Sequence, residues 1–182
     1  MKLILVSYGK QLLCVMMDMM EGNETLITTT DQIVVFTIDE LSYALSLTAV
    51  VKVIHAIEIR HLPKAPEIII GIINVKGQII PVVDIRKRFG LVAREIDLDD
   101  RLIIADTGKR QVAILVDSVT GIRDLVPGQM SFARETLPFA EHISGVAKVD
   151  DGLILIYNLD RFLSLDEEME LEQALKTKDK KQ

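Results

Sequence analysis

Few side chains in this sequence could carry out acid–base, nucleophilic or metal chemistry, and their spacing does not favour it. The histidines are His55, His61 and His142. His55 and His61 are six positions apart across the junction of a strand and a loop, which matches no familiar metal-ligand spacing. The single cysteine, Cys14, has no evident base beside it that would activate a thiolate. We therefore expect no metal site and no nucleophile.

The acidic residues indicate caps and a linker rather than a reaction centre. Asp84 follows an apolar strand, and its counterpart in the second half is Asn158, which lacks acid–base chemistry but caps helices equally well. The run EIDLDD at 95–100 lacks the glycine and terminal Glu of a calcium loop, so we interpret it as a solvated linker. The glycines beside strands form no phosphate-binding pattern. The sequence thus predicts no cofactor and no catalytic residue.

The composition favours a protein partner over nucleic acid or membrane. The chain has 182 residues, 49% of them hydrophobic, which fits one domain or two small subdomains sharing a core. Aromatic residues make up 4% and the formal charge is −6, whereas nucleic-acid binders rely on stacking platforms, Lys and Arg. No apolar run approaches the roughly 18 residues of a membrane span. One cysteine excludes an intramolecular disulfide, and we expect a soluble, cytoplasmic protein.

Short apolar runs with turn signals between them predict a mainly β protein from residue 31 onward. QIVVFTI and YALSL flank the turn DELS, and IIIGIINV and IIPVV are joined through Lys76 and Gly77. A short helix is expected from Asp84 to Gly90. Pro81 cannot donate to a ladder, which predicts an edge or a barrel corner. Residues 1–30 have no clean periodicity and are interpreted as an N-terminal extension of uncertain order.

The second half of the chain repeats the first. Residues 31–53 match 100–122 at an offset of 69, and residues 71–85 match 145–159 at an offset of 74. Each half, about 31–90 and about 100–163, supplies about five short strands, which predicts two small five-stranded barrels packed together. Residues 164–182 are expected to form a helix with a basic tail, because Ser164 and Glu167 make a capping box.

Several strands are apolar on both faces. A barrel buries only its inner face, so the outward residues of IVVF, IIIGII, IIPVV and LILIY must contact the other barrel, the terminal helix or another protein. Two interpretations stay open. Either the junction between the barrels covers all of this surface, or enough remains for a protein-docking face.

These segments resemble the CheW-like domain family. The resemblance runs from about Gln32 to Leu163 and is carried by IVVFTIDELSYALSLTAVVKVI, LPKAPEIIIGIINVKGQIIPVVDIRKRFG, RLIIADTGKRQVAILVDSVTGIRDL and ISGVAKVDDGLILIYNLDRFLS. The second block is the most specific. The family pattern is close to G-[VI]-x-N-[LV]-[RK]-G-x-[VI]-[IV]-P-[VI]-[VI]-D-[LI]-R, and residues 71–86 satisfy it throughout.

The resemblance implies a fold, a function and partners. The implied fold is mainly β, with two packed, intertwined five-stranded SH3-like β-barrels, short helices and a C-terminal helix. The implied function is a non-enzymatic adaptor in chemotaxis arrays. It would couple a CheA-type histidine kinase, through the kinase's regulatory domain, to the cytoplasmic tips of methyl-accepting chemoreceptors. The protein would be cytoplasmic and recruited to membrane-associated arrays, without binding nucleic acid or inserting into the membrane.

Carried onto this chain, the resemblance gives candidate partner-binding residues: Val50, Lys52, Gly71, Asn74, Lys76 and Gly77. The alternative is that most of these maintain the fold. Gly71 would then serve packing, Asn74 and Gly77 turn geometry, and Val50 the core.

One position departs from the family pattern. After AVV the family usually carries Glu, which can pair with the basic residue of the signature hairpin, whereas this chain has Lys52 and Lys76 at the two positions. Either the side chains splay apart, or Glu58 intervenes, or a partner supplies the carboxylate. This leaves open a stand-alone kinase-regulatory domain in a variant motility pathway, such as gliding or twitching. A small-molecule or oligonucleotide-binding barrel is less favoured, because it would need exposed aromatics or a basic stripe.

Overall fold

The computed structural model of the chain describes residues 6–8, 11–13, 31–125, 130–131, 143–149, 152–159 and 163–179. Its strands are β1 (Val6–Tyr8), β2 (Gln11–Leu13), β3 (Asp31–Ile38), β4 (Leu41–Ser46), β5 (Val50–His55), β6 (Ile69–Val75), β7 (Gln78–Asp84), β8 (Arg101–Asp106), β9 (Gln111–Val116), β10 (Ser118–Leu125), β11 (Met130–Ser131), β12 (Ile143–Val149) and β13 (Gly152–Tyr157). The helices are the 3₁₀ turn η1 (Leu47–Ala49), α1 (Ile85–Phe89) and α2 (Leu165–Asp179). Cys14, His142, the turn at 150–151 and most of the N-terminal extension lie outside the described residues.

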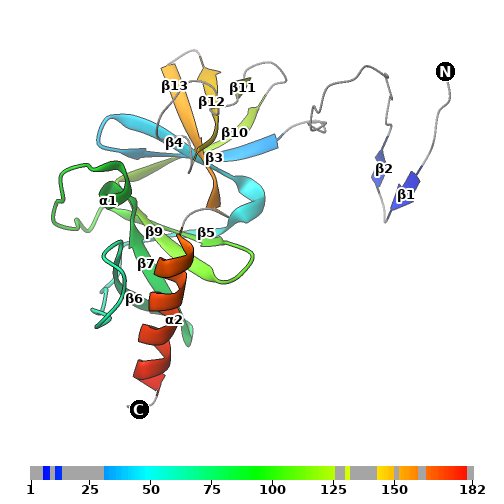
Figure 1. Cartoon of the computed structure of the whole chain (residues 1–182). Helices are drawn as coiled ribbons and strands as arrows, with labels where there is room; N and C mark the ends of the chain where they lie inside the picture. The colour runs from blue at the N-terminus through cyan, green and yellow to red at the C-terminus, as the bar shows by residue number, and fades with distance from the viewer. Residues whose placement is uncertain are drawn as a thin grey trace.

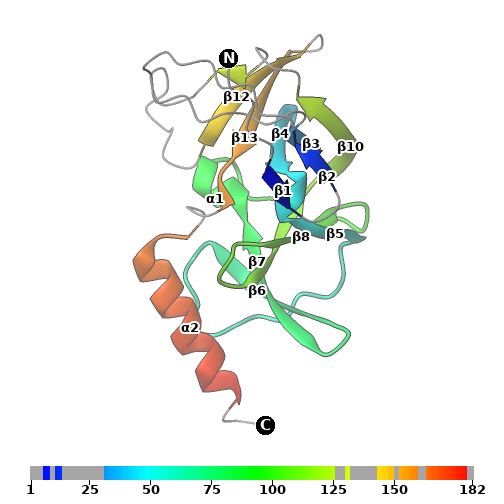
Figure 2. The same ribbon diagram turned by 90° about the vertical axis from the view of Figure 1, so that its right-hand side faces the viewer.

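The strands form two large sheets that lie one above the other (Figure 1). The upper sheet has the order β10-β3-β4-β13-β12-β11 and the lower sheet the order β5-β8-β9-β7-β6, while β1 and β2 pair only with each other. Figure 2, turned by a quarter, keeps the same two layers and shows α2 running along the side of the lower sheet. The mainly β, SH3-like architecture is therefore confirmed.

The two halves of the chain exchange strands. The upper sheet combines β3 and β4 with four strands from the second half, and the lower sheet combines β5, β6 and β7 with β8 and β9 from the second half. The parallel pairs β13–β4 and β7–β9 join the halves within each sheet. The repeat alone suggested that each half forms its own barrel, and the pairing shows that this is wrong. The intertwining implied by the resemblance is present.

The repeat in the sequence is also a repeat in strand register. Val50 lies opposite Ala105, and Val119, 69 positions later, lies opposite Phe36, 69 positions before Ala105. The register slips directly after Val50 and after Val119, which places a β-bulge at the same point in β5 and β10. The strands β6 and β12 slip at equivalent points too, before Gly71 and before Gly145. The two halves therefore share bulges as well as hydrophobic pattern.

Three apolar clusters explain why so many strands are apolar on both faces. One lies inside the upper sheet and contains Ile33, Val35, Ala44, Leu125, Ala147, Ile154 and Ile156. A second lies inside the lower sheet and contains Ile73, Ile80, Val82, Leu102, Ile104 and Ala113. The main core lies between the sheets and takes the alternate residues of the same strands, such as Phe36, Leu45 and Ile103. Each of these strands is thus sandwiched between two cores.

Both helices begin where the sequence predicts. Asp84 caps α1, because its side chain accepts a hydrogen bond from the Arg86 N–H, and Gly90 ends the helix in the left-handed conformation. Ser164 and Glu167 form the expected capping box of α2, each accepting a hydrogen bond from the other's backbone N–H. Leu171 and Ala174 of α2 are buried in the main core.

Pro81 lies opposite Ile72 within β7, at the point where pairing with β9 has not yet begun. The strand itself is internal, with β6 on one side and β9 on the other. The missing N–H of Pro81 is tolerated there because the ladder to β9 starts one residue later, at Val82. Pro81 therefore lies just outside the stretch of β7 that pairs with β9, and not on an edge strand of the sheet.

Candidate partner-binding surface

The tip of the β6–β7 hairpin is a rigid two-residue turn. Lys76 and Gly77 both have positive φ angles, 54° and 90°, as the turn of a tight hairpin requires. The Asn74 Oδ1 accepts a hydrogen bond of 2.8 Å from the Gly77 N–H and holds the turn closed. Asn74, Lys76 and Gly77 are all exposed. The hairpin therefore presents the Lys76 ammonium group on a preformed backbone.

Gly71 is buried and serves packing. A Cβ at this position would lie 2.5 Å from the Arg60 carbonyl oxygen and 2.6 Å from the Ile59 Cγ2. The close approach is needed because Arg60 and Ile72 exchange backbone hydrogen bonds of 2.9 and 2.8 Å. These bonds tie the segment that follows β5, on one edge of the lower sheet, to β6 on the other edge. The absence of a side chain at Gly71 thus allows the close approach that closes the barrel.

Val50 and Lys52 lie on β5, on either side of its bulge. Val50 is half-buried and packs against the main core. Lys52 is half-buried opposite Ile104, on the same side of the strand as Ile54. Val51 and Val53 point the other way and are 50% and 38% exposed. The outward face of β5 therefore carries two exposed apolar side chains next to the exposed His55.

Lys52 and Lys76 are not brought into a pair. Each residue of a strand lies opposite one residue of the neighbouring strand, and these neighbours can be followed from Lys52 on β5 across the sheet to β6. The residue reached on β6 is Gly71, which is five positions before Lys76. Within the described residues neither lysine makes an ion pair or a side-chain hydrogen bond. Glu58 does not intervene, since its carboxylate lies 3.8 Å from the Arg60 guanidinium. Of the alternatives left open by the sequence, separated side chains fit the structure, and both cations remain available to a partner.

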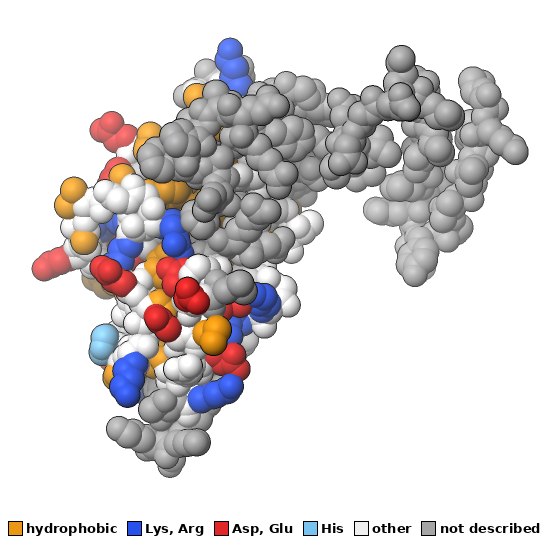
Figure 3. All heavy atoms as spheres, in the orientation of Figure 1, with side chains coloured by type: hydrophobic (Ala, Val, Ile, Leu, Met, Phe, Trp, Pro, Cys, Tyr) orange, Lys and Arg blue, Asp and Glu red, His pale blue; other side chains and the backbone are white. Residues whose placement is uncertain are grey.

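Most of the apolar surface expected to face outward is buried inside the molecule. All four residues of IVVF are buried, and in IIIGII only Ile70 is partly exposed. The sheet junction covers these faces because each strand lies between two cores. Ile79 and Leu153 stay 43% and 63% exposed at the starts of β7 and β13. Figure 3 accordingly shows hydrophobic side chains interspersed with charged ones on this side of the molecule. Of the two interpretations left open by the sequence, burial inside the molecule thus accounts for most of these apolar residues, and a few stay exposed.

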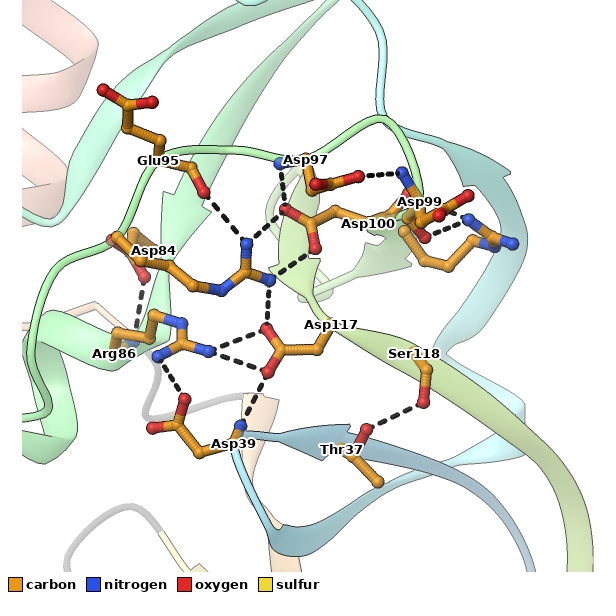
Figure 4. A network of polar contacts seen from close by, with 12 residues as sticks. Thr37, Asp39, Asp84, Arg86, Glu95, Asp97, Asp99, Asp100, Asp117 and Ser118 are labelled. Carbon is orange, nitrogen blue, oxygen red and sulfur yellow. Dashed lines mark hydrogen bonds and ion pairs between the residues drawn. The ribbon is translucent and has the colours of Figure 1, made fainter.

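A network of charged side chains joins the elements at the junction of the sheets (Figure 4). Arg86 of α1 is 7% exposed, and its guanidinium donates to Asp39 in the β3–β4 turn and to both carboxylate oxygens of Asp117, all at 2.8 Å. The Asp39 N–H also donates to Asp117, at 2.6 Å. Burial alone would lower the pKa of Arg86, but the bonds to Asp117 and Asp39 outweigh it and raise the pKa above its usual value.

The same network anchors the segment between α1 and β8. Arg94 donates to Asp100 and, at 2.6 Å, to Asp117. These bonds raise the pKa of Arg94. Burial alone would raise the pKa of the Asp117 carboxyl, yet the bonds from Arg86 and Arg94 hold that pKa below its ordinary value. Asp100 is 3% exposed. The interpretation of residues 95–100 as a merely solvated linker was therefore wrong for Asp100, whose burial is compensated by Arg94.

Sequence reasoning did not single out this network. Its members are far apart in the chain, and the one available signal was Arg86, the last residue of the family pattern in 71–86. His55 and His61 are exposed. Within the described residues, no cluster of three or more His, Cys, Asp or Glu side chains could hold a metal ion. Of the helices in the described part of the chain, none combines the length and apolar character that a membrane crossing requires.

Comparison with known proteins agrees with the fold. The model of the CheW-like domain matches residues 32–167, which include both large sheets and the start of α2. A chemotaxis protein CheW of Thermotoga maritima is 30% identical over 132 residues, which is 72% of this chain and 87% of that protein. Protein FrzA of Myxococcus xanthus is 25% identical over 118 residues, covering 62% of this chain and 71% of FrzA.

Among solved structures, the scaffolding protein TtCheW from Thermoanaerobacter tengcongensis superposes with a TM-score of 0.70 at 32% sequence identity. The superposition covers 76% of this chain and 95% of TtCheW. The family match, the sequence relatives and the solved structure therefore all point to the same family. The chain therefore belongs to the CheW-like domain family of chemotaxis adaptor proteins.

Proposed function

We propose that this protein is a non-catalytic adaptor that couples chemoreceptors to a CheA-type histidine kinase in chemotaxis signal transduction. The observation that carries the proposal is the family match over residues 32–167. Relatives that are matched over most of their length bear the name chemotaxis protein CheW. The protein would act in the cytoplasm, at receptor arrays, through simultaneous binding of the two partners.

The architecture supports a bridging role for a physical reason. An adaptor that couples two proteins must hold its two contact faces at a fixed distance and orientation. Here each large sheet contains strands from both halves of the chain, and the main core is common to both sheets. The sheets cannot separate without exposing this shared core to water. Two partners bound to the two sheets would therefore be held at a constant geometry.

The best-supported contact residues are those that are exposed and fixed in place. The hairpin tip presents Lys76 on the turn closed by Asn74 and Gly77. The outward face of β5 presents Val51 and Val53. We propose these two elements, together with Lys52, as partner contacts. Gly71 and Val50 then support the contacts from within, as packing residues.

The partner surface facing the hairpin would carry carboxylates. Both Lys52 and Lys76 lack an acidic partner among the described residues, and a half-buried ammonium group gains most from a carboxylate when water is excluded. The family usually has opposite charges at these positions. The kinase and receptors that cooperate with this chain would then carry a compensating acidic residue.

Separate binding assays test the proposal. The full chain is titrated with the purified regulatory domain of the CheA-type kinase and, independently, with receptor tip fragments from the same cell. An adaptor binds both and forms a ternary complex. Binding to the kinase alone would indicate a stand-alone regulatory domain, and binding to neither would refute the proposal.

A further inference from the structure

The segment between α1 and β8 carries large apolar side chains that are exposed to solvent. Val92 and Leu98 are 84% and 85% exposed, the highest values among the large hydrophobic residues in the described part of the chain, and Ile96 is 44% exposed. We call residues 91–99 the acidic–apolar loop. In Figure 1 it projects at the left beside α1. In Figure 3 hydrophobic and acidic side chains lie next to one another at that edge.

The loop is held in place at its start and in its middle. The Leu91 N–H donates to the Arg86 carbonyl at 2.9 Å, and the Leu91 side chain packs against the main core. In the middle, the Arg94 guanidinium binds Asp100 and Asp117. The loop is therefore fixed to the same charged network that joins α1 to the sheets.

Leu98 lies at the apex of a tight turn. The Asp100 N–H donates to the Asp97 carbonyl at 3.1 Å, and the Asp97 N–H donates to the Asp100 carboxylate at 2.8 Å. The Asp99 N–H donates to the Asp97 side chain at 2.9 Å. Turn apices usually carry polar residues or glycine, whereas a leucine held there gains nothing inside this chain. A preformed loop that displays apolar side chains loses little entropy when a partner covers them.

The charge of the loop defines the partner. Residues 91–100 contain four carboxylates and one arginine. Asp100 is buried against Arg94, while Glu95, Asp97 and Asp99 are exposed beside Ile96 and Leu98. We propose that the acidic–apolar loop is a second docking surface, which inserts Val92 and Leu98 into an apolar pocket bordered by Lys and Arg on another protein. This surface lies outside the hairpin and β5, so it adds to the adaptor function rather than restating it.

A synthetic amphipathic peptide of leucine and lysine serves as the probe, with the same peptide carrying glutamate at the lysine positions as its charge control. Binding to the full chain is followed by fluorescence anisotropy and by amide chemical shifts. The lysine peptide should bind roughly tenfold or more tightly than the glutamate peptide, and its shifts should map to residues 91–100. Shifts spread over the whole acidic surface would overturn the proposal.

Matched variants separate the loop from the general charge of the protein. V92S/L98S removes the displayed side chains and should weaken binding of the lysine peptide roughly tenfold or more without changing the melting temperature. I122S/L153S removes two residues that are 58% and 63% exposed on β10 and β13, and should leave the affinity unchanged. Equal losses in both double variants would refute docking at the loop.

Sedimentation of the same variants tests whether a second copy of this chain, rather than a basic partner, covers the loop. If V92S/L98S converted an oligomer into a monomer, the loop would be a contact between copies and the basic partner would be wrong.

Discussion

The Arg86 Nη2 lies 2.8 Å from both carboxylate oxygens of Asp117, so one guanidinium group of α1 holds the start of the turn between β9 and β10. Arg86 is nearly inaccessible to water and also binds Asp39. A buried charge in this position is stabilising only while all of its partners remain. The pair therefore couples α1 to both sheets, and removal of Arg86 leaves Asp39 without a cation and Asp117 with Arg94 alone.

Arg86→Met is expected to destabilise the protein by about 1.5–3 kcal/mol, because it keeps the side-chain volume but leaves Asp39 without a cation and Asp117 with Arg94 alone. Urea unfolding followed by circular dichroism measures the loss. Arg60→Met is the control, since the Arg60–Glu58 pair is 75% and 80% exposed and should contribute at most about 1 kcal/mol. Similar losses in the two variants would mean that the network adds no special stability.

The network also predicts a dependence of stability on acid. The pKa of Asp117 is lowered in the folded protein, so its stabilisation is complete above the unfolded value of about 3.9 and is lost as the pH falls through the folded pKa. The free energy of unfolding of the native protein should therefore exceed that of Asp117→Asn by a large margin at neutral pH. The margin should shrink below about pH 4. A margin that stays constant down to pH 2 would contradict this assignment.

Gly71→Ala is expected to destabilise the protein by about 1–3 kcal/mol, because the new Cβ overlaps the Arg60 carbonyl and that backbone oxygen cannot swing away. Thermal or urea unfolding measures the effect. Gly77→Asn is the matched control. It has no neighbour within 4 Å, and asparagine tolerates the left-handed conformation. If Gly71→Ala unfolded like the native protein but failed to bind partners, Gly71 would be a contact residue after all.

Local features could be predicted from the sequence because each depends on neighbouring residues. The Asp84 cap, the Ser164–Glu167 capping box and the Lys76-Gly77 turn all follow from short-range hydrogen bonding, and all are present. The repeat at offsets of 69 and 74 also appears in the registers of the strands. The alternation of hydrophobic and polar residues determines which side chains face inward. This alternation is the pattern that the two halves of the sequence share.

Pairing between distant segments could not be predicted in the same way. Because the two halves have nearly the same pattern, the edge of β4 that does not face β3 could pair with a strand of its own half or with β13. The hydrophobic pattern is equally satisfied by both. For the same reason, an apolar run does not say whether a core or a partner covers its second face. Arg86 and Asp117 are 31 positions apart, and Asp100 is surrounded in sequence by exposed acids, so neither its burial nor the network had a local signal.

Lys76→Glu should abolish or strongly weaken partner binding while the fold melts normally. Lys76 is exposed and has no ionic partner among the described residues, so we expect its charge to contribute to binding rather than to folding. We expect a loss of affinity of roughly tenfold or more for the kinase domain or the receptor tip, because a carboxylate would face the partner's carboxylate. Titration calorimetry measures the affinity and a thermal melt measures the fold. Lys148→Glu, an exposed lysine of β12 at the position equivalent to Asn74, controls for the change in net charge and should bind normally. A collapse of the Lys76→Glu melting curve would instead make Lys76 a structural residue.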